Sequence, residues 1–169
     1  MIDKDILFLF AELAVALAGF SAIIGVFGSR RDATNLKVNA LRLQVMLETC
    51  FMVAAAALIP VLLDKFDLSQ SAIWRVASGV FLCMAIPFEF VARSRTKHMP
   101  NMTLTKFNVN TINWALSLGA DLLLVAILIN VISAWSDAIY FVALFSQLTL
   151  AGILFVQFAA DMFAHADRD

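Results

Sequence analysis

Charged residues are scarce in this sequence. Only 15% of its 169 residues are Asp, Glu, Lys or Arg, while 62% are hydrophobic, whereas an ordinary soluble domain is roughly a quarter charged. The mean hydropathy is correspondingly high, at +0.89. A soluble fold of this size could not enclose that much apolar surface, so most of it must face lipid. The composition therefore predicts a polytopic membrane protein.

Cysteine and histidine are equally rare. Cys50 and Cys83 lie inside apolar segments without a C-x-x-C pattern, which argues against a disulfide framework and against a dithiol redox pair. His98 and His165 lie in a loop and in the C-terminal tail, so a haem or zinc site between apolar helices would lack ligands. We expect no metal and no cofactor.

Several functional signatures are also missing. The sequence contains no GxGxxG, Walker A, GxSxG or HExxH pattern, no S4-like arginine repeat and no TVGYG filter. Its net charge is −1 and no basic stripe exists outside the loops, which disfavours nucleic-acid binding. We expect neither an enzyme nor a nucleic-acid-binding protein.

What the sequence does contain is five apolar stretches, each near the ~20 residues needed to cross a hydrocarbon core. They cover residues 6–27, 43–63, 72–92, 110–134 and 138–164. Glu12 interrupts the first stretch and its apolar run continues to Phe27, which indicates a retained helix and not a signal peptide. We predict one transmembrane domain, residues 1–169, with an all-α fold: a polytopic bundle of five transmembrane helices.

Basic residues predict the orientation of that bundle. Eight of them flank the loop after the first stretch and the loop after the third, against three on the opposite side. The eight are Arg30, Arg31, Lys37, Arg42, Arg93, Arg95, Lys97 and Lys106; the three are Lys4, Lys65 and Arg75. Basic loops stay in the cytoplasm, so the N-terminus is predicted outside and the C-terminus inside. Trp74, Trp114, Trp135 and Tyr140 lie near the ends of the stretches, where interfacial aromatic belts are expected.

The first stretch separates small residues from bulky ones. At 100° per residue, one side carries Ala11, Ala14, Ala18, Ala22 and Gly25, and the other carries Leu9, Leu13, Leu17, Phe20, Ile24 and Phe27. Small residues let membrane helices approach closely, so this side is predicted to be a packing seam, with a pore lining as the alternative. Glu12 is expected on the flank of the small side, pointing into protein.

Polar residues form a track on the fourth stretch. Asn110, Asn113, Ser117 and Asp121 project within one quadrant, and the track ends at Asp121 near the middle of the bilayer. A carboxylate at that depth costs roughly 2.5–3.5 kcal/mol on insertion scales. It is therefore expected to face protein or water, with Gln147 of the fifth stretch as a candidate hydrogen-bond partner.

The remaining stretches carry further carboxylates near the predicted cytoplasmic boundary. These are Glu48, Glu89 and Asp161, the last of which shares a helix face with Gln147 and Gln157. Two interpretations remain open. The groups form an ion-pair and hydrogen-bond layer that holds the helices together, or they form a cation or proton vestibule that leads to Asp121.

The first segment carries a family resemblance. Residues 11–14 read AELA, residues 18–24 read AGFSAII, Arg30 and Arg31 follow, and the second stretch ends near Ile59-Pro60. This pattern, over roughly the first third of the chain, resembles a family of small, uncharacterised bacterial membrane proteins. The resemblance implies a multi-helix bundle in the bacterial inner membrane, and it carries no activity with it.

Two functions of different classes follow. The first is an oligomeric cation or proton channel, or a small transporter, with Asp121 in the pathway. The alternative is a non-catalytic scaffold or accessory subunit that packs against a partner through its small-residue helix faces. In both cases we expect a multi-pass protein of the inner membrane that associates with copies of itself or with another membrane protein.

Overall fold

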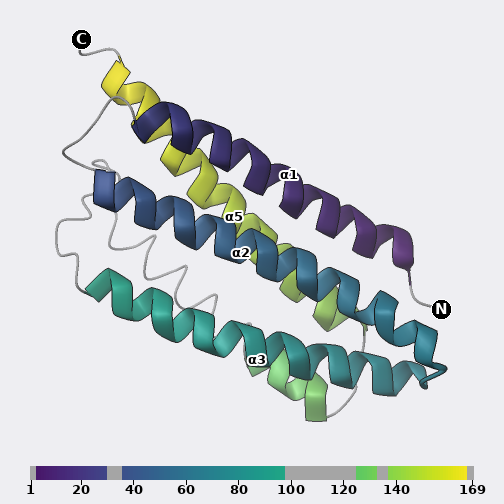
Figure 1. Cartoon of the computed structure of the whole chain (residues 1–169). Coiled ribbons are helices and arrows are strands. Elements are labelled where there is room, and N and C mark those ends of the chain that lie inside the picture. Colours follow the sequence, from purple (N-terminus) through teal and green to yellow (C-terminus); the bar gives the residue numbers. More distant parts are fainter. Residues whose placement is uncertain (1–2, 30–35, 98–124, 133–136, 167–169) are drawn as a thin grey trace.

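The structure is a computed structural model, and it describes residues 3–29, 36–97, 125–132 and 137–166. These residues form the helices α1 (Lys4–Ser29), α2 (Leu36–Leu63), α3 (Gln70–Lys97) and α5 (Asp137–Ala166), and the short 3-10 helix η1 (Asp64–Phe66). Residues 125–132 are also helical. The described part of the chain is thus all-α, as the sequence predicts (Figure 1).

Four of these helices are long and apolar enough to cross a membrane. Their candidate spans are Lys4–Val26, Leu43–Phe66, Gln70–Val91 and Asp137–Val156, which coincide with the first, second, third and fifth predicted stretches. Most of the other predicted stretch, 110–134, lies outside the described residues. The described residues therefore contain four candidate spans, while the prediction for the whole chain was five.

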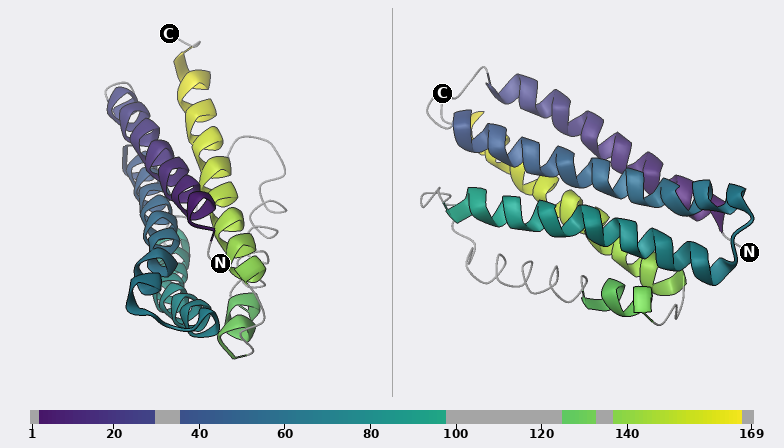
Figure 2. Two further views of the ribbon diagram at one scale, coloured as in Figure 1. Left: turned by 90° about the vertical axis from the view of Figure 1, so that its right-hand side faces the viewer. Right: turned by 60° about the horizontal axis from the view of Figure 1, so that its bottom comes forward.

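Three helices lie side by side as a layer, with α2 between α1 and α3. Helix α5 crosses behind this layer, from the first half of α3 toward the end of α1 (Figures 1 and 2). One end of the layer holds the start of α1 and the connection from α2 to α3, where Nζ of Lys4 lies 2.6 Å from Oδ2 of Asp64. The opposite end holds the last turns of α1, α3 and α5.

The helices pack with a repeat of seven residues. Buried positions alternate at spacings of four and three along α2 and α5, which is the pattern of left-handed helix packing. On α2 they are Met46, Cys50, Val53, Ala57 and Pro60, and on α5 they are Tyr140, Leu144, Gln147 and Ala151. Ala54 and Ala56 are buried as well. Small side chains on several sides of α2 let its neighbours approach closely, and α2 is accordingly the central helix.

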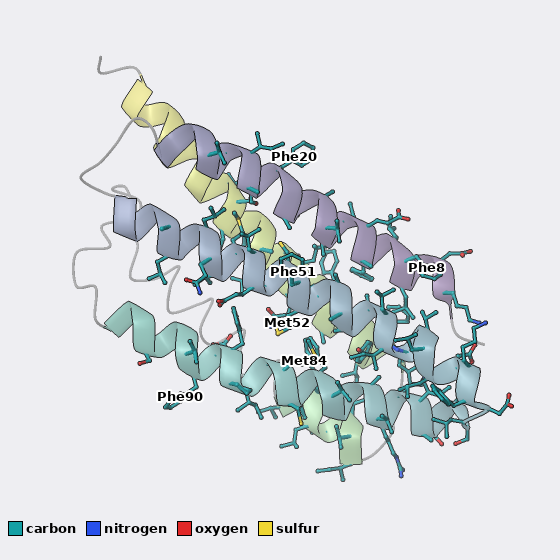
Figure 3. All side chains as sticks on the ribbon, viewed as in Figure 1. Phe8, Phe20, Phe51, Met52, Met84 and Phe90 are labelled. Carbon is teal, nitrogen blue, oxygen red and sulfur yellow. The ribbon has the colours of Figure 1, made fainter. Side chains whose placement is uncertain are left out.

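Large apolar side chains cover the outside of the bundle. Phe8 and Phe20 point away from the layer along α1, and Phe90 points away along α3 (Figure 3). Phe90 is 77% exposed and Phe20 is 61% exposed. A water-soluble monomer rarely exposes an apolar surface of this extent, whereas helices that face lipid are expected to do so.

Candidate functional site

Helix α1 packs into the bundle, mainly against α2 and also against α5, through a narrow seam of buried residues. Leu7, Ala14, Ala18 and Ser21 are buried, and the hydroxyl of Ser21 bonds the carbonyl of Leu17 at 2.6 Å and lies 3.3 Å from Sδ of Met46. At Gly25, an added Cβ would meet the end of the Leu43 side chain at 2.5 Å. Glycine at this position therefore leaves room for Leu43 of α2.

The seam differs from the prediction in several places: Leu7 is buried although it was not predicted there, and Leu17, predicted on the bulky side, is partly buried against the core. Ala14 and Ala18 lie in it, but Ala22 is exposed and Ser21 is buried in its place. The reason is the packing repeat. Leu7, Ala14 and Ser21 follow one another at intervals of seven residues, which is two turns at 3.5 residues per turn. A straight helix has 3.6 residues per turn, so contacts that repeat every seven residues shift gradually around the helix toward positions earlier in the sequence than a straight projection predicts. The seam consequently reaches Ser21 and not Ala22.

Glu12 does not point into the bundle, which corrects the sequence interpretation. It is exposed, because it follows the seam residue Leu7 by five positions and thus lies about 140° away around the helix. It shares this outer face with Phe8, Val15 and Gly19, and nothing lies within 4 Å of the position of a Cβ on Gly19. We refer to Phe8, Glu12, Val15 and Gly19 as the α1 outer face. Glu12 is eight residues after Lys4, about 12 Å along the helix.

A hydrogen bond between α5 and α2 compensates for a proline. Pro60 has no N–H, so it cannot donate to the carbonyl of Ala56 four residues earlier. The hydroxyl of Tyr140 donates to that carbonyl instead, at 2.6 Å. Tyr140 is fully buried, and an unpaired carbonyl in such surroundings would be costly. The tyrosine therefore replaces the donor that the proline removes.

Aromatic rings surround this hydrogen bond. The ring of Tyr140 lies 5.5 Å from that of Trp74 and 6.1 Å from that of Phe81, both on α3, measured between centroids. Phe141 lies 6.4 Å from Phe10 of α1. Trp74 and Tyr140 were expected in interfacial belts, but Trp74 is only 5% exposed and Tyr140 is not exposed. Their places near the helix ends agree with that expectation, whereas their direction, into the bundle, does not.

A second polar contact joins α3 to residues 125–132. Nδ2 of Asn130 donates to Oγ of Ser78 over 3.0 Å, and both side chains are fully buried. Asn130 was not among the predicted site residues. A signal for it exists in the sequence, since it is the one polar side chain among residues 122–132, and an amide in an apolar helix needs a partner.

Gln147 is a buried polar residue whose hydrogen bonding is incomplete. Its side chain is 4% exposed, and its Oε1 has no hydrogen-bond partner in the described part of the chain. It lies ten residues into α5, about 15 Å along the helix, which is the middle of the Asp137–Val156 span. A buried acceptor at this depth can receive a hydrogen bond from water or from a protonated carboxyl group.

The other predicted polar residues are only partly described. Glu48 is half-buried and accepts a hydrogen bond from Nε2 of Gln44 at 2.7 Å, and Glu89 is half-buried on α3. Asp161 and Gln157 belong to α5, but their side chains lie outside the described set. The predicted track of Asn110, Asn113, Ser117 and Asp121 also lies outside the described residues. Among those that are described, no group of three His, Cys, Asp or Glu residues could hold a metal ion.

Two kinds of polar site thus emerge: paired groups that join helices inside the bundle, and a carboxylate on the α1 outer face. Neither arrangement corresponds to a recognised catalytic constellation. In comparisons with known proteins, no family model, no curated protein and no solved structure matches this chain.

Proposed function

We propose that this chain is a non-catalytic subunit of a membrane-embedded assembly, and that the α1 outer face is its contact with a neighbouring protein. The observation that carries the proposal is the exposure of Glu12 within the Lys4–Val26 span. A carboxylate within the hydrocarbon core costs roughly 2.5–3.5 kcal/mol and is normally found facing protein or water. A protein neighbour on the α1 outer face would remove Glu12 from lipid.

The interior of the bundle supports a structural role. Two pairs of its polar groups connect different helices: Tyr140 with the carbonyl of Ala56, and Asn130 with Ser78. Hydrogen bonds of this kind add to helix association in lipid, where the hydrophobic effect between helices is absent. They favour a rigid bundle that presents its outer faces in fixed positions.

The membrane and the orientation belong to the same proposal. The protein resides in the bacterial inner membrane with five transmembrane helices, N-outside and C-inside. The eight basic residues of the two loops favour this orientation over the reverse. The ion pair of Lys4 with Asp64 supports placing the N-terminus and the α2–α3 connection on one side.

Photo-crosslinking in intact membranes tests the proposal. A photoreactive amino acid replaces Val15, which is exposed beside Glu12, and in a control variant it replaces Phe51, which is exposed on α2. We expect an adduct with a membrane protein, identified by mass spectrometry, from position 15 and not from position 51. Only lipid adducts at both positions would refute a protein contact on the α1 outer face.

A second candidate function is conduction of a cation or proton past Asp121, and one observation favours it. Oε1 of Gln147, which has no partner among the described residues, lies at mid-span; in this second proposal, a water molecule or a protonated carboxyl of Asp121 supplies its hydrogen bond. Flux into proteoliposomes tests this function. Conduction predicts that Asp121→Asn and Gln147→Leu both lower the flux, while Thr149→Val, on the exposed side of α5, does not. Wild-type flux no greater than that of empty vesicles would refute conduction.

A further inference from the structure

Two exposed residues of opposite charge lie on the two edges of the helix layer. Glu12 is exposed on α1 and Arg75 is exposed on α3, and α2 separates these helices (Figures 1 and 2). Neither side chain forms an ion pair or hydrogen bond in the part of the chain that the structure describes. Both are therefore available to a neighbouring molecule.

The two charges lie at similar depths. The Lys4–Asp64 ion pair aligns the start of α1 with η1, just ahead of α3. Glu12 is about 12 Å from the start of α1, and Arg75 is about 8 Å from the start of α3. The difference is about 4 Å, and an arginine can extend its apolar stem along a helix by that much to reach a partner.

The surfaces around these charges have compatible shapes. On α3, Val76 and Cys83 are exposed near Arg75, and Gly79 between them has nothing within 4 Å of a Cβ position. We call Arg75, Val76, Gly79 and Cys83 the α3 outer face. Gly19 occupies an equally open place on the α1 outer face. Small residues at such positions permit close approach of two membrane helices, and α1 and α3 run in the same direction.

We propose that the neighbour is a second copy of this chain, whose α3 outer face packs against the α1 outer face and places its Arg75 beside Glu12. This inference rests on the proposed function and names its partner. The pair neutralises a carboxylate that would otherwise face lipid. Because the two faces differ, the contact is head-to-tail, and each copy keeps one free face for a further copy. The assembly therefore grows beyond a dimer and closes as a ring if the rotation permits.

Cysteine crosslinking tests both the partner and the head-to-tail geometry. In a Cys83→Ser background, chains with Glu12→Cys and differently tagged chains with Arg75→Cys are produced together and oxidised in the membrane. We expect disulfide-linked pairs between the two tagged chains. A single chain that carries both cysteines should give a ladder of dimers, trimers and larger species. Its own two cysteines cannot pair because α2 holds α1 and α3 too far apart for a disulfide.

Matched variants test whether the crosslinks depend on the contact between the α1 outer face and the α3 outer face. Phe51→Cys with Arg75→Cys should give no ladder, because Phe51 lies on α2 and outside both faces. Glu12→Arg and Arg75→Glu should each weaken self-association on the order of tenfold, and the two together should restore it. Glu12, Phe51, Arg75 and Cys83 are all exposed, so these changes leave the helix packing intact.

Three kinds of outcome would overturn the inference, and only the last of them would also overturn the proposed function. Glu12→Cys chains that pair mainly with each other, or a ladder that stops at the dimer, would show a symmetric contact. Adducts from position 15 that contain only a different protein would still support the proposed membrane-embedded assembly, but they would exclude a second copy of this chain as the neighbour. Lipid adducts alone would refute both.

Discussion

Replacing Tyr140 by Phe should destabilise the bundle because it removes the hydrogen bond to one buried carbonyl group, that of Ala56. The substitution keeps the ring between Trp74 and Phe81 and removes only the hydroxyl, which donates to Ala56 over 2.6 Å. Because Pro60 offers no N–H, the Ala56 carbonyl then loses its donor inside the bundle. An unpaired buried acceptor costs about 1–3 kcal/mol in soluble proteins.

The magnitude in a membrane protein is smaller. Hydrogen bonds between membrane helices average about 0.6 kcal/mol, with a maximum of about 1.7 kcal/mol. The full burial of Tyr140 and the missing N–H of Pro60 place this bond near the maximum. We expect Tyr140→Phe to lower the free energy of unfolding by about 1.5 kcal/mol, measured by SDS-titrated unfolding in mixed micelles.

The proline supplies a decisive control. Pro60→Ala restores the N–H that bonds the Ala56 carbonyl within α2. In that background, Tyr140→Phe should cost about 0.5 kcal/mol or less, so the double-mutant cycle gives a coupling of about 1 kcal/mol. Thr149→Val is a matched control on α5, because its hydroxyl bonds the carbonyl of Phe145 on the exposed side, and it should be nearly neutral. Equal costs of Tyr140→Phe in both backgrounds would refute the compensation.

Three further predictions concern packing, polar contacts and topology. Ala18→Leu should destabilise the protein by about 1–3 kcal/mol by overpacking the seam, whereas Ala22→Leu, on the exposed side, should be neutral in the same unfolding assay; equal effects would place the seam elsewhere. Asn130→Leu and Ser78→Ala should show a coupling of about 0.6 kcal/mol in a double-mutant cycle, and strict additivity would contradict their contact. A reporter that is active only in the periplasm should stay silent when fused after Asp169; activity there would refute the C-inside orientation.

Local patterns were sufficient to predict four of the helices and part of their packing. The apolar stretches gave their positions, since length and hydropathy are properties of the chain itself. The α1 seam was predictable at Ala14 and Ala18 from their small size. At Ala22 and Glu12 the side chains are exposed on this bundle and not packed in its seam, because a projection at 100° per residue describes an isolated straight helix. Contact with a neighbour imposes the seven-residue repeat that places Ser21 in the seam.

Contacts between distant residues were beyond local patterns. Tyr140 and Ala56 are 84 positions apart, so no spacing rule connects them. The acceptor of this hydrogen bond is nevertheless predictable from the sequence, because a proline inside a helix frees the carbonyl four residues earlier. The polar track that ends at Asp121 lies outside the described residues and stays a prediction.

The mass of the protein in lipid discs taken directly from membranes tests the central claim most directly. A single chain has a mass of 18.6 kDa. Native mass spectrometry should release the wild type as an assembly that contains more than one protein chain. The Glu12→Arg variant should release mainly the single chain. A wild type that is released only at the mass of one chain would contradict the account.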